Sequence, residues 1–170
     1  MSYLLFDKKY KEETVSPIVK TKIGEFKIQI HDLKLFKGLY ISGENKNIKK
    51  SLLRMMFSLI SMGKAKIFYC KNNKGEIIHT SLVVPKCWKF PFLDKDDYEI
   101  GPCITNEQYR GNGIYPQILN YIVHSHGNKN TKFYMFVAKD NIPSIHGIEK
   151  AGFIRCGEAN VTKLKQYRRI

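Results

Sequence analysis

The sequence has 170 residues, of which 43% are hydrophobic and 26% are charged. A chain of this length and composition suits a single globular domain, and we expect residues 1–170 to form one. No window approaches the roughly 20 apolar residues that a membrane-spanning helix needs, and the first residues lack the basic start of a signal peptide. We therefore expect a cytoplasmic protein without a membrane partner.

The chain is strongly basic, because 29 Lys and Arg face 15 Asp and Glu and leave a formal net charge of +14. Such a charge favours anionic partners, although it also fits a lysine-rich surface that only keeps the protein soluble. The lysines are spread along the chain, which makes nucleic acid an unlikely partner. Neither the four cysteines nor any cluster of His, Cys and Asp has metal-binding spacing, so we predict no metal site.

In the first half of the chain, apolar residues recur at helical spacing over 47–62, and Gly63 is a natural stop for this helix. We expect its methionines at 55, 56 and 62 to fill the core. Alternation and short apolar runs between turn residues predict strands at 26–30, 35–42, 65–70 and 76–84, the last two joined by a turn at 71–75.

Two stretches show no regular period. Residues 1–25 have no assignable pattern, and 85–97 is expected to be an irregular loop. The aromatic residues of this loop, Trp88, Phe90 and Phe92, either border an active cleft or cover the edge of the core.

The second half alternates strands with helices. We predict strands at 98–105, 133–138, 153–156 and 161–167, and helices from 114 to about 127 and from 141 to 151. Asp140 or Asn141 is a natural N-cap of the second helix, and Gly152 its C-cap. The pattern indicates a mixed α/β (α+β) domain in which helices cover a single sheet.

The stretch 108–115 joins a strand to a helix through a turn with two glycines, Gly111 and Gly113. The first N–H groups of a helix lack partners, and the helix dipole is positive there, so such a turn attracts anions. Glycines let the backbone take positive φ and come close to a phosphate. The turn therefore predicts a phosphate-bearing cofactor.

Two motifs lie in a fixed order along this half of the chain. The turn has the pattern Gln108-x-x-Gly111-x-Gly113, and Asn141 opens a helix that ends in Glu-Lys-Ala-Gly-Phe at 149–153. Together they resemble the GNAT superfamily of acyl-CoA-dependent N-acetyltransferases, over roughly residues 98–157. The resemblance implies a mixed, mostly antiparallel sheet flanked by helices, with a splayed strand pair at the CoA site.

The resemblance also implies acetyl-CoA as the acyl donor, with its arm bonded along one strand and its acyl group in the gap before strand 133–138. The residues it implies are Cys103, Ile104 and Thr105 for the arm, Gln108, Tyr109, Arg110, Gly111, Asn112, Gly113, Ile114 and Tyr115 around the pyrophosphate, and Asn141 and Ser144 beside the pantetheine.

A base is required because an amine is mostly ammonium at neutral pH. Asp97, just before strand 98–105, and Glu99, within it, are two residues apart and therefore share a face. Cys103 shares that face too if no bulge intervenes. Glu99 is the first candidate. His79, in the preceding strand, has an ordinary pKa that suits the same role.

The sequence departs from the family at the proton donor. Many members carry a Tyr that protonates the departing thiolate, at the position occupied here by Ile148, which cannot donate a proton. Tyr115, His146 or Ser144 could replace it, as could water and backbone dipoles.

We therefore expect an N-acetyltransferase, monomer or homodimer, in which an amine attacks acetyl-CoA directly in a ternary complex. The positive charge favours a small anionic acceptor, with a nucleotide-linked amino sugar as the first choice. The stretch 100–116 also looks closer to members that serve surface-polysaccharide pathways. The alternative is a catalytically degenerate module of the same fold that binds CoA or RNA, which Ile148 favours.

Overall fold

In the computed structural model, which describes residues 2–34, 40–42 and 48–170, nine strands form one sheet in the order β2-β3-β4-β5-β6-β7-β1-β8-β9. The strands are β1 (Ser2–Lys9), β2 (Ile18–Thr21), β3 (Gly24–Asp32), β4 (Lys66–Lys71), β5 (Ile77–Pro85), β6 (Tyr98–Thr105), β7 (Lys132–Ala138), β8 (Ile154–Val161) and β9 (Tyr167–Arg169). All neighbours are antiparallel except β6 and β7, which run parallel. This mixed, mostly antiparallel sheet confirms the predicted fold class.

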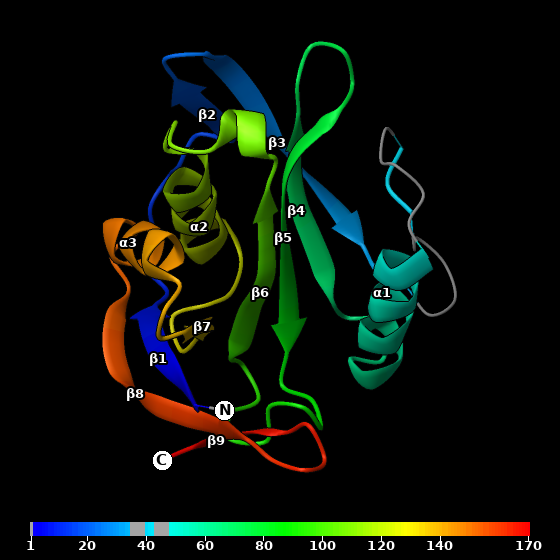
Figure 1. The fold of residues 1–170 in the computed structure, drawn as a ribbon, viewed down its shortest axis with the longest axis vertical. Helices are drawn as coiled ribbons and strands as arrows, with labels where there is room; N and C mark the ends of the chain where they lie inside the picture. The colour runs from blue at the N-terminus through cyan, green and yellow to red at the C-terminus, as the bar shows by residue number, and fades with distance from the viewer. Residues whose placement is uncertain (1, 35–39, 43–47) are drawn as a thin grey trace.

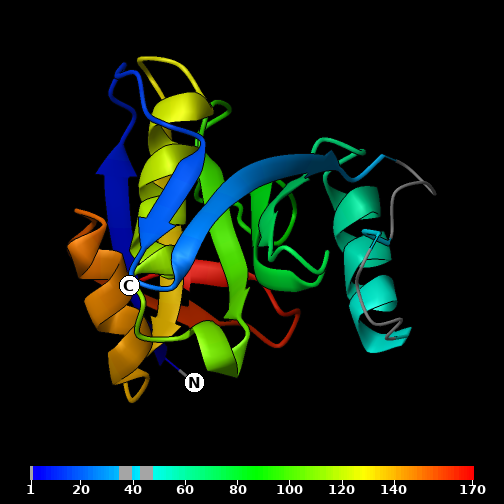
Figure 2. The same cartoon turned by 90° about the horizontal axis from the view of Figure 1, so that it is seen from above.

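Helices cover both faces of the sheet. The helices of the described residues are α1 (Ile48–Ile60), α2 (Ile114–Ser125) and α3 (Ile142–Lys150). In Figures 1 and 2, α2 and α3 lie side by side, whereas α1 lies far from them, beyond β3 and β4. Ile118 and Ile122 of α2 belong to one core cluster, and Phe57 of α1 belongs to a separate one on the opposite face.

The strand β1 lies in the middle of the sheet, between β7 and β8, and the sequence did not predict it. Leu4 and Phe6 point into the cluster under α2, and Leu5 points into the other. A strand buried on both faces has a continuous apolar run rather than an alternating one. Here that run is only Leu4 to Phe6, which is too short to distinguish from a loop.

The helix α1 ends as predicted, with Gly63 at a φ of 74°, but its apolar stripe is not buried. Leu52 and Met56 are 54% and 37% exposed, and Met62, just beyond the helix, is 75% exposed. The expectation that these methionines fill the core is therefore wrong for Met56 and Met62. Most of the predicted strand 35–42 lies outside the described residues.

The predicted C-terminal pair exists with different bounds. The strands β8 and β9 are antiparallel, but most of the predicted strand 161–167 forms the turn between them, closed by the N–H of Thr162 donating to the carbonyl of Gln166 at 2.9 Å. Loop 85–97 is irregular as predicted. Phe90 and Phe92 cover the core edge, while Trp88 is 55% exposed.

Within the described residues, no helix combines the length and the apolar character needed to cross a bilayer.

Candidate active site

The strand β6 runs directly into the glycine turn that the sequence singled out. Asn106 caps a single 3-10 turn (Glu107–Tyr109), and Gly111 and Gly113 follow in the left-handed region with φ of 76° and 73°. Gly113 is the N-cap of α2 and provides no side-chain cap. The first N–H groups of α2 are therefore left for a ligand, in the arrangement that binds anions at helix starts.

The polar side chains of the turn bond to nearby backbone carbonyls or to neighbouring side chains and so hold the turn in shape. The amide of Asn112 donates to the carbonyls of Tyr109 (3.3 Å) and Arg110 (3.0 Å). The guanidinium of Arg110 donates back to the carbonyl of Thr105 at 3.2 Å. The hydroxyl of Tyr109 accepts from the amide of Asn72 at 3.0 Å, so this side chain points away from the turn's open side. The turn thus offers mainly backbone to an anion.

The strands β6 and β7 separate soon after they meet. They pair only at Tyr98–Phe133 and Glu99–Tyr134, so the rest of β6 has no strand partner on its β7 side. That unpaired backbone includes Cys103, Ile104 and Thr105, and a ligand can add to it as a strand does. The gap opens toward the glycine turn at the end of β6.

A bulge in β6 separates Glu99 from Cys103. Glu99 lies opposite Val84, and Cys103 lies opposite Ser81. The step from one pair to the other is therefore four residues along β6 but only three along β5. One extra residue turns the following side chains to the other face. We expected Glu99 and Cys103 to share a face only if no bulge intervened, and with the bulge they lie on opposite faces: Val84, opposite Glu99, belongs to the α1 side, and Cys103 packs on the α2 side.

Of the two candidate acids before the bulge, Asp97 has a structural task. Its buried carboxylate accepts from the N–H of Asp94 at 3.0 Å and from the N–H of Lys132 at 2.9 Å. It thereby ties the end of loop 85–97 to the start of β7. This leaves Glu99 as the acid available for chemistry.

Glu99 is buried and has an oxygen to spare. One carboxylate oxygen, Oε1, lies 2.6 Å from where a Cβ at Gly101 would be, so only glycine leaves it room. The other, Oε2, has no hydrogen-bond partner among the described residues. Burial raises the pKa of Glu99 well above its ordinary value, and the Lys89 ammonium partly opposes this rise. A carboxylate with a raised pKa is a stronger base than an exposed one.

Lys89 places its ammonium among aromatic rings on this same face. Its Nζ lies 4.7 Å from the ring centroid of Phe57, 5.6 Å from that of Tyr167 and 5.7 Å from that of Phe90. Cations are attracted to the faces of aromatic rings at such distances. The N–H of Tyr167 also donates to the carbonyl of Lys89 at 3.0 Å, which ties β9 to the loop.

His79 is buried, with both ring nitrogens engaged. Nδ1 lies 2.7 Å from the Thr105 hydroxyl and Nε2 lies 2.8 Å from the Ser81 hydroxyl. Burial lowers the pKa of His79 to about 3. The ordinary pKa that suggested His79 as a base is therefore lost, because the charged imidazolium is poorly solvated there. His79 is neutral at physiological pH and holds Thr105 and Ser81 in place.

Tyr115 occupies the α2 side of the gap. Its hydroxyl lies close enough to the hydroxyl of Ser144 on α3 and to the thiol of Cys103 on β6 for both groups to influence its pKa. Its ring packs on Gly147, where an added Cβ would lie 2.5 Å from the ring. Burial raises the pKa of Tyr115 above its ordinary value, so the phenol stays protonated.

The other residues considered for the missing proton donor are arranged differently. Ile148 is fully inside the core under α2, and His146 is exposed on α3. Ser144 lies beside the hydroxyl of Tyr115. Asn141 is the N-cap of α3, its side-chain oxygen accepting from the N–H of Ser144 at 3.3 Å. The capping role predicted for Asn141 is confirmed, while contact with a pantetheine stays a prediction.

The structure sorts the predicted cofactor residues by exposure. Ile104, Gln108, Arg110, Gly111 and Asn141 are exposed, Ile114 is buried, and the remainder are partly buried: Cys103, Thr105, Tyr109, Asn112, Gly113, Tyr115 and Ser144. The thiol of Cys103 has its pKa raised to about 12 by burial and stays protonated.

A groove of about 990 Å³ beside the glycine turn was not predicted. Its outer wall is formed by residues 15–22, in the part of the chain that had no assignable pattern. The only sequence signal was the pair of lysines at 20 and 22, which has no period and does not indicate where the segment packs. No group of His, Cys, Asp and Glu suited to a metal occurs among the described residues.

No protein-family model matches this chain, and no curated protein matches it. Among solved structures, it is similar to an acetyltransferase of the GNAT family from Colwellia psychrerythraea, with a TM-score of 0.61 at 15% sequence identity. The chain has the GNAT fold. The alignment covers 92% of this chain and 53% of that one.

A second solved structure with the same overall arrangement is a functionally unknown conserved protein from Staphylococcus epidermidis ATCC 12228. The TM-score is 0.53 at 10% identity, over 92% of this chain and 58% of that one. This chain therefore spans less than two thirds of either neighbour. Likeness at such identities shows the GNAT fold alone, and function depends on the residues of the site.

Proposed function

We propose that this chain is an acetyl-CoA-dependent N-acetyltransferase in which an amine attacks the thioester directly in a ternary complex. The observation that carries the proposal is an alignment: the gap between β6 and β7 leads directly to the glycine turn at the end of β6. A strand with unpaired backbone accommodates an extended amide-containing arm, and the turn accommodates the phosphates that follow it. Pantetheine and pyrophosphate are joined in this order in CoA.

In this proposal the backbone of Cys103, Ile104 and Thr105 bonds the pantetheine, and the turn from Gln108 to Tyr115 holds the pyrophosphate. Asn141 and Ser144 border the arm from α3. The acyl carbon then lies near the bulge, between Glu99 and Tyr115. The fold supports acetyl transfer generally, and the positions of Glu99 and Tyr115 are the basis for proposing where the acyl carbon lies.

In this mechanism the two proton transfers take place on opposite sides of β6. Glu99, on the α1 side, removes a proton from the incoming ammonium, directly or through one water. The amine nitrogen then attacks the carbonyl carbon and becomes positively charged. As the C–S bond breaks, the nitrogen loses its second proton to water, which leaves a neutral amide, and Glu99 later releases its own proton to solvent. Tyr115, on the α2 side, gives its proton to the departing thiolate. It thereby replaces the donor that Ile148 cannot supply. Solvent reprotonates Tyr115 after the thiol leaves.

His79 has a supporting part in this scheme. As a neutral imidazole with both nitrogens bonded, it orients Thr105 and Ser81, and Ser81 lies opposite Cys103 in the sheet. It therefore keeps the end of β6 in register with β5 rather than accepting a proton from the substrate.

For the acceptor we propose a small anionic amine, with a nucleotide-linked amino sugar as the first choice. A hollow of about 40 Å³ on the α1 side of β6 has room for only a small part of such an acceptor. It is lined by Lys50, Leu53, Arg54, Ile67, Thr80, Leu82, Pro102 and Ile104. The net charge of +14 disfavours a polycationic acceptor.

Titration calorimetry with acetyl-CoA, followed by a panel of amines assayed for thiol release, tests this function. We expect binding at micromolar acetyl-CoA and thiol release that depends on the amine, strongest for anionic amino sugars. No binding at high micromolar acetyl-CoA would contradict the proposal. Binding without thiol release for any amine would favour the second candidate, a degenerate CoA-binding module, which Ile148 at the donor position supports.

A further inference from the structure

The helix α1 has the reverse polarity of an ordinary surface helix. A surface helix buries an apolar stripe and exposes its polar face to water. In α1 the buried side carries Arg54 and Ser58, and the buried Ser61 follows just beyond the end of the helix. Phe57 is the apolar side chain that this side contributes to the core.

The outward side of α1 is apolar instead. Ile48, Leu52, Met56 and Leu59 follow one another at intervals of four, four and three residues, which places them on one side of the helix. We call these four residues the outer stripe. All four are exposed, from 37% at Met56 to 76% at Ile48. A row of apolar side chains in water gains free energy when a partner covers it, so the outer stripe is a contact surface.

Hydrogen bonds fix which side of α1 faces the sheet. The hydroxyl of Ser58 donates to the carbonyl of Lys34 at 2.9 Å, and the hydroxyl of Ser61 accepts from the N–H of Ala65 at 3.1 Å. Rotating the outer stripe inward would break these bonds and bring Phe57 into water. The outer stripe is therefore a stable feature of the fold.

Positive charges border the outer stripe. Lys49 and Lys50 lie in the first turn of α1, and Lys64 follows its end. Lys49 and Lys64 are exposed, one near each end of the stripe. The residues of α1 include no Asp or Glu, and the whole chain has a formal charge of +14. An exposed apolar stripe with cations beside it is typical of a helix that lies in the surface of an anionic bilayer.

Area and charge argue against a second copy of this chain as the partner of the stripe. The 13 residues of α1 extend over about 20 Å, so a stripe about 10 Å wide offers roughly 200 Å². A stable protein interface takes about 800 Å² from each partner. A second copy would also bring the same charge of +14, which repels. An anionic bilayer attracts the lysines and needs no matching surface.

The position of α1 suits contact with a flat surface. In Figures 1 and 2 it stands on the side of the molecule remote from α2 and α3. The glycine turn is at the start of α2. A bilayer that meets α1 therefore leaves the proposed donor site open.

We infer that α1 anchors the protein to the surface of anionic membranes, with the outer stripe at the boundary of headgroups and acyl chains and with Lys49 and Lys64 at the lipid phosphates. The described helices cannot cross a bilayer, but a helix that lies in its surface needs no such length. The inference departs from the expectation of no membrane partner. It does not depend on the proposed acetyl transfer.

Sedimentation of the full chain with vesicles tests the inference. Vesicles of phosphatidylcholine alone are compared with vesicles of equal parts phosphatidylcholine and phosphatidylglycerol. We expect the partition coefficient on the mixed vesicles to be higher by about tenfold or more, because lysines near an anionic surface each add to binding.

The double variant L52S/L59S separates insertion from attraction by charge, since it interrupts the outer stripe and keeps every charged residue. Both side chains are exposed, so the circular dichroism spectrum should be unchanged. We expect the partition coefficient on mixed vesicles to fall about tenfold or more, because two leucines no longer leave water. The matched control I154S/L164S changes two exposed apolar residues outside the stripe and should bind as the wild type does.

A fluorescence variant follows the outer stripe directly. Trp88 is the single tryptophan of the chain, so W88F/L52W moves the fluorescent side chain into the stripe. Its emission should shift to shorter wavelength on mixed vesicles, because the indole enters the interfacial region. An unshifted emission would contradict insertion of the stripe.

Other outcomes would also overturn the inference. Equal partitioning of the wild type and L52S/L59S would reduce the interaction to net charge, and no preference for mixed vesicles would exclude the anionic membrane. A dimer seen by analytical ultracentrifugation, absent in L52S/L59S and without vesicle binding, would assign the stripe to a second copy. Calorimetry with acetyl-CoA tests the proposed function separately, since L52S/L59S should bind acetyl-CoA as the wild type does.

Discussion

Glu99 and His79 show how burial changes two side chains in opposite ways. Both are buried beside β6, and burial penalises the charged form of each. For the carboxyl this raises the pKa and makes it a better base. For the imidazole it lowers the pKa to about 3 and removes its capacity to accept a proton at neutral pH. The same physical effect therefore favours one candidate base and disfavours the other.

Glu99→Gln should lower the turnover number by about 10²–10⁴-fold, the range typical of a lost general base. Acetyl-CoA affinity should stay unchanged, because the proposed cofactor contacts lie beyond the bulge. Steady-state thiol release and calorimetry measure the two effects. Glu149→Gln, an exposed carboxyl on α3, is the control and should keep wild-type turnover. A Glu99→Gln enzyme with full turnover would remove Glu99 from the mechanism.

The same variant should change how stability depends on pH. Burial raises the folded-state pKa of Glu99 above 4.5, so the folded protein holds this proton more tightly than the unfolded chain. The stabilising contribution is present below about pH 4.5 and is lost as the pH rises through the raised pKa. Gln cannot ionise, so the Tm of the variant relative to wild type should increase as the pH rises from 4.5. A constant difference would contradict the raised pKa.

Tyr115→Phe should lower turnover by about 10²-fold while leaving acetyl-CoA affinity near wild type. The ring on Gly147 is kept, and only the proposed proton donor is lost. Tyr69→Phe is the matched control, since its hydroxyl donates to Gln29 of β3 at 2.7 Å, away from the gap. It should release thiol at the wild-type rate. Equal turnover in the two variants would show that Tyr115 is not the donor.

At the scale of elements, the site depends on where β6 ends and α2 begins. The strand ends in an unpaired edge, the turn takes two left-handed glycines, and α2 starts without a side-chain cap. Each feature leaves backbone groups for a ligand. Together they align an unpaired strand edge with a helix start that attracts anions, as the proposed donor site requires.

Gly111→Val should abolish detectable acetyl-CoA binding and leave the domain folded. The φ of 76° penalises a side chain by about 1–2 kcal/mol, although a Cβ would meet no atom within 4 Å. Gly75→Val is a matched control, because Gly75 has a φ of 81° and equal space in the β4–β5 turn. Calorimetry and thermal melts should show similar stability loss in both variants but lost binding only for Gly111→Val. Retained binding would exclude the turn from the site.

At the scale of the whole molecule, the N-terminal strand joins two parts of the sheet. The strand β1 lies between β7 and β8, so the β8–β9 hairpin reaches the rest of the sheet only through it. That hairpin carries Tyr167, which borders the Lys89 ammonium beside Glu99. The first residues of the chain therefore support one wall of the proposed acceptor side.

Leu5→Ala should lower the free energy of unfolding by about 2–5 kcal/mol, as expected for a leucine removed from a close-packed core. Leu5 is 0% exposed in the middle of β1. Leu164→Ala, at a residue 66% exposed in the β8–β9 turn, should change it by less than about 0.5 kcal/mol. Urea unfolding followed by circular dichroism measures both. A cost at Leu5 no larger than at Leu164 would contradict its place in the core.

The features predicted correctly share a local origin. The left-handed glycines, the N-cap at Asn141 and the strand 98–105 depend on residues within one turn or one strand, and their signals lie in neighbouring positions. The splay between β6 and β7 came from the resemblance to GNAT enzymes rather than from the residues. The exposure of Met56 was missed because a helical period does not reveal whether anything packs on the stripe.

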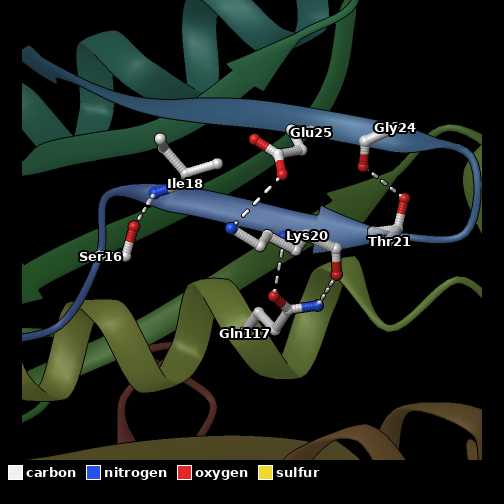
Figure 3. A network of polar contacts seen from close by, with 7 residues as sticks. All are labelled: Ser16, Ile18, Lys20, Thr21, Gly24, Glu25 and Gln117. Atoms are coloured by element: carbon white, nitrogen blue, oxygen red, sulfur yellow. Dashed lines mark hydrogen bonds and ion pairs between the residues drawn. The ribbon is translucent and has the colours of Figure 1, made fainter.

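The sequence by itself determined the glycine turn, the strand that leads into it and the capped helix that follows, because short-range backbone conformation depends on local residue types. Only the tertiary structure decided the rest. The bulge that places Glu99 and Cys103 on opposite faces of β6 depends on register with β5, and the central position of β1 depends on pairing with strands more than a hundred residues away. The attachment of β2 to α2 depends on one glutamine, Gln117, whose amide meets the backbone of Lys20 (Figure 3). Such long-range contacts are selected by packing of the whole chain, which no local pattern records.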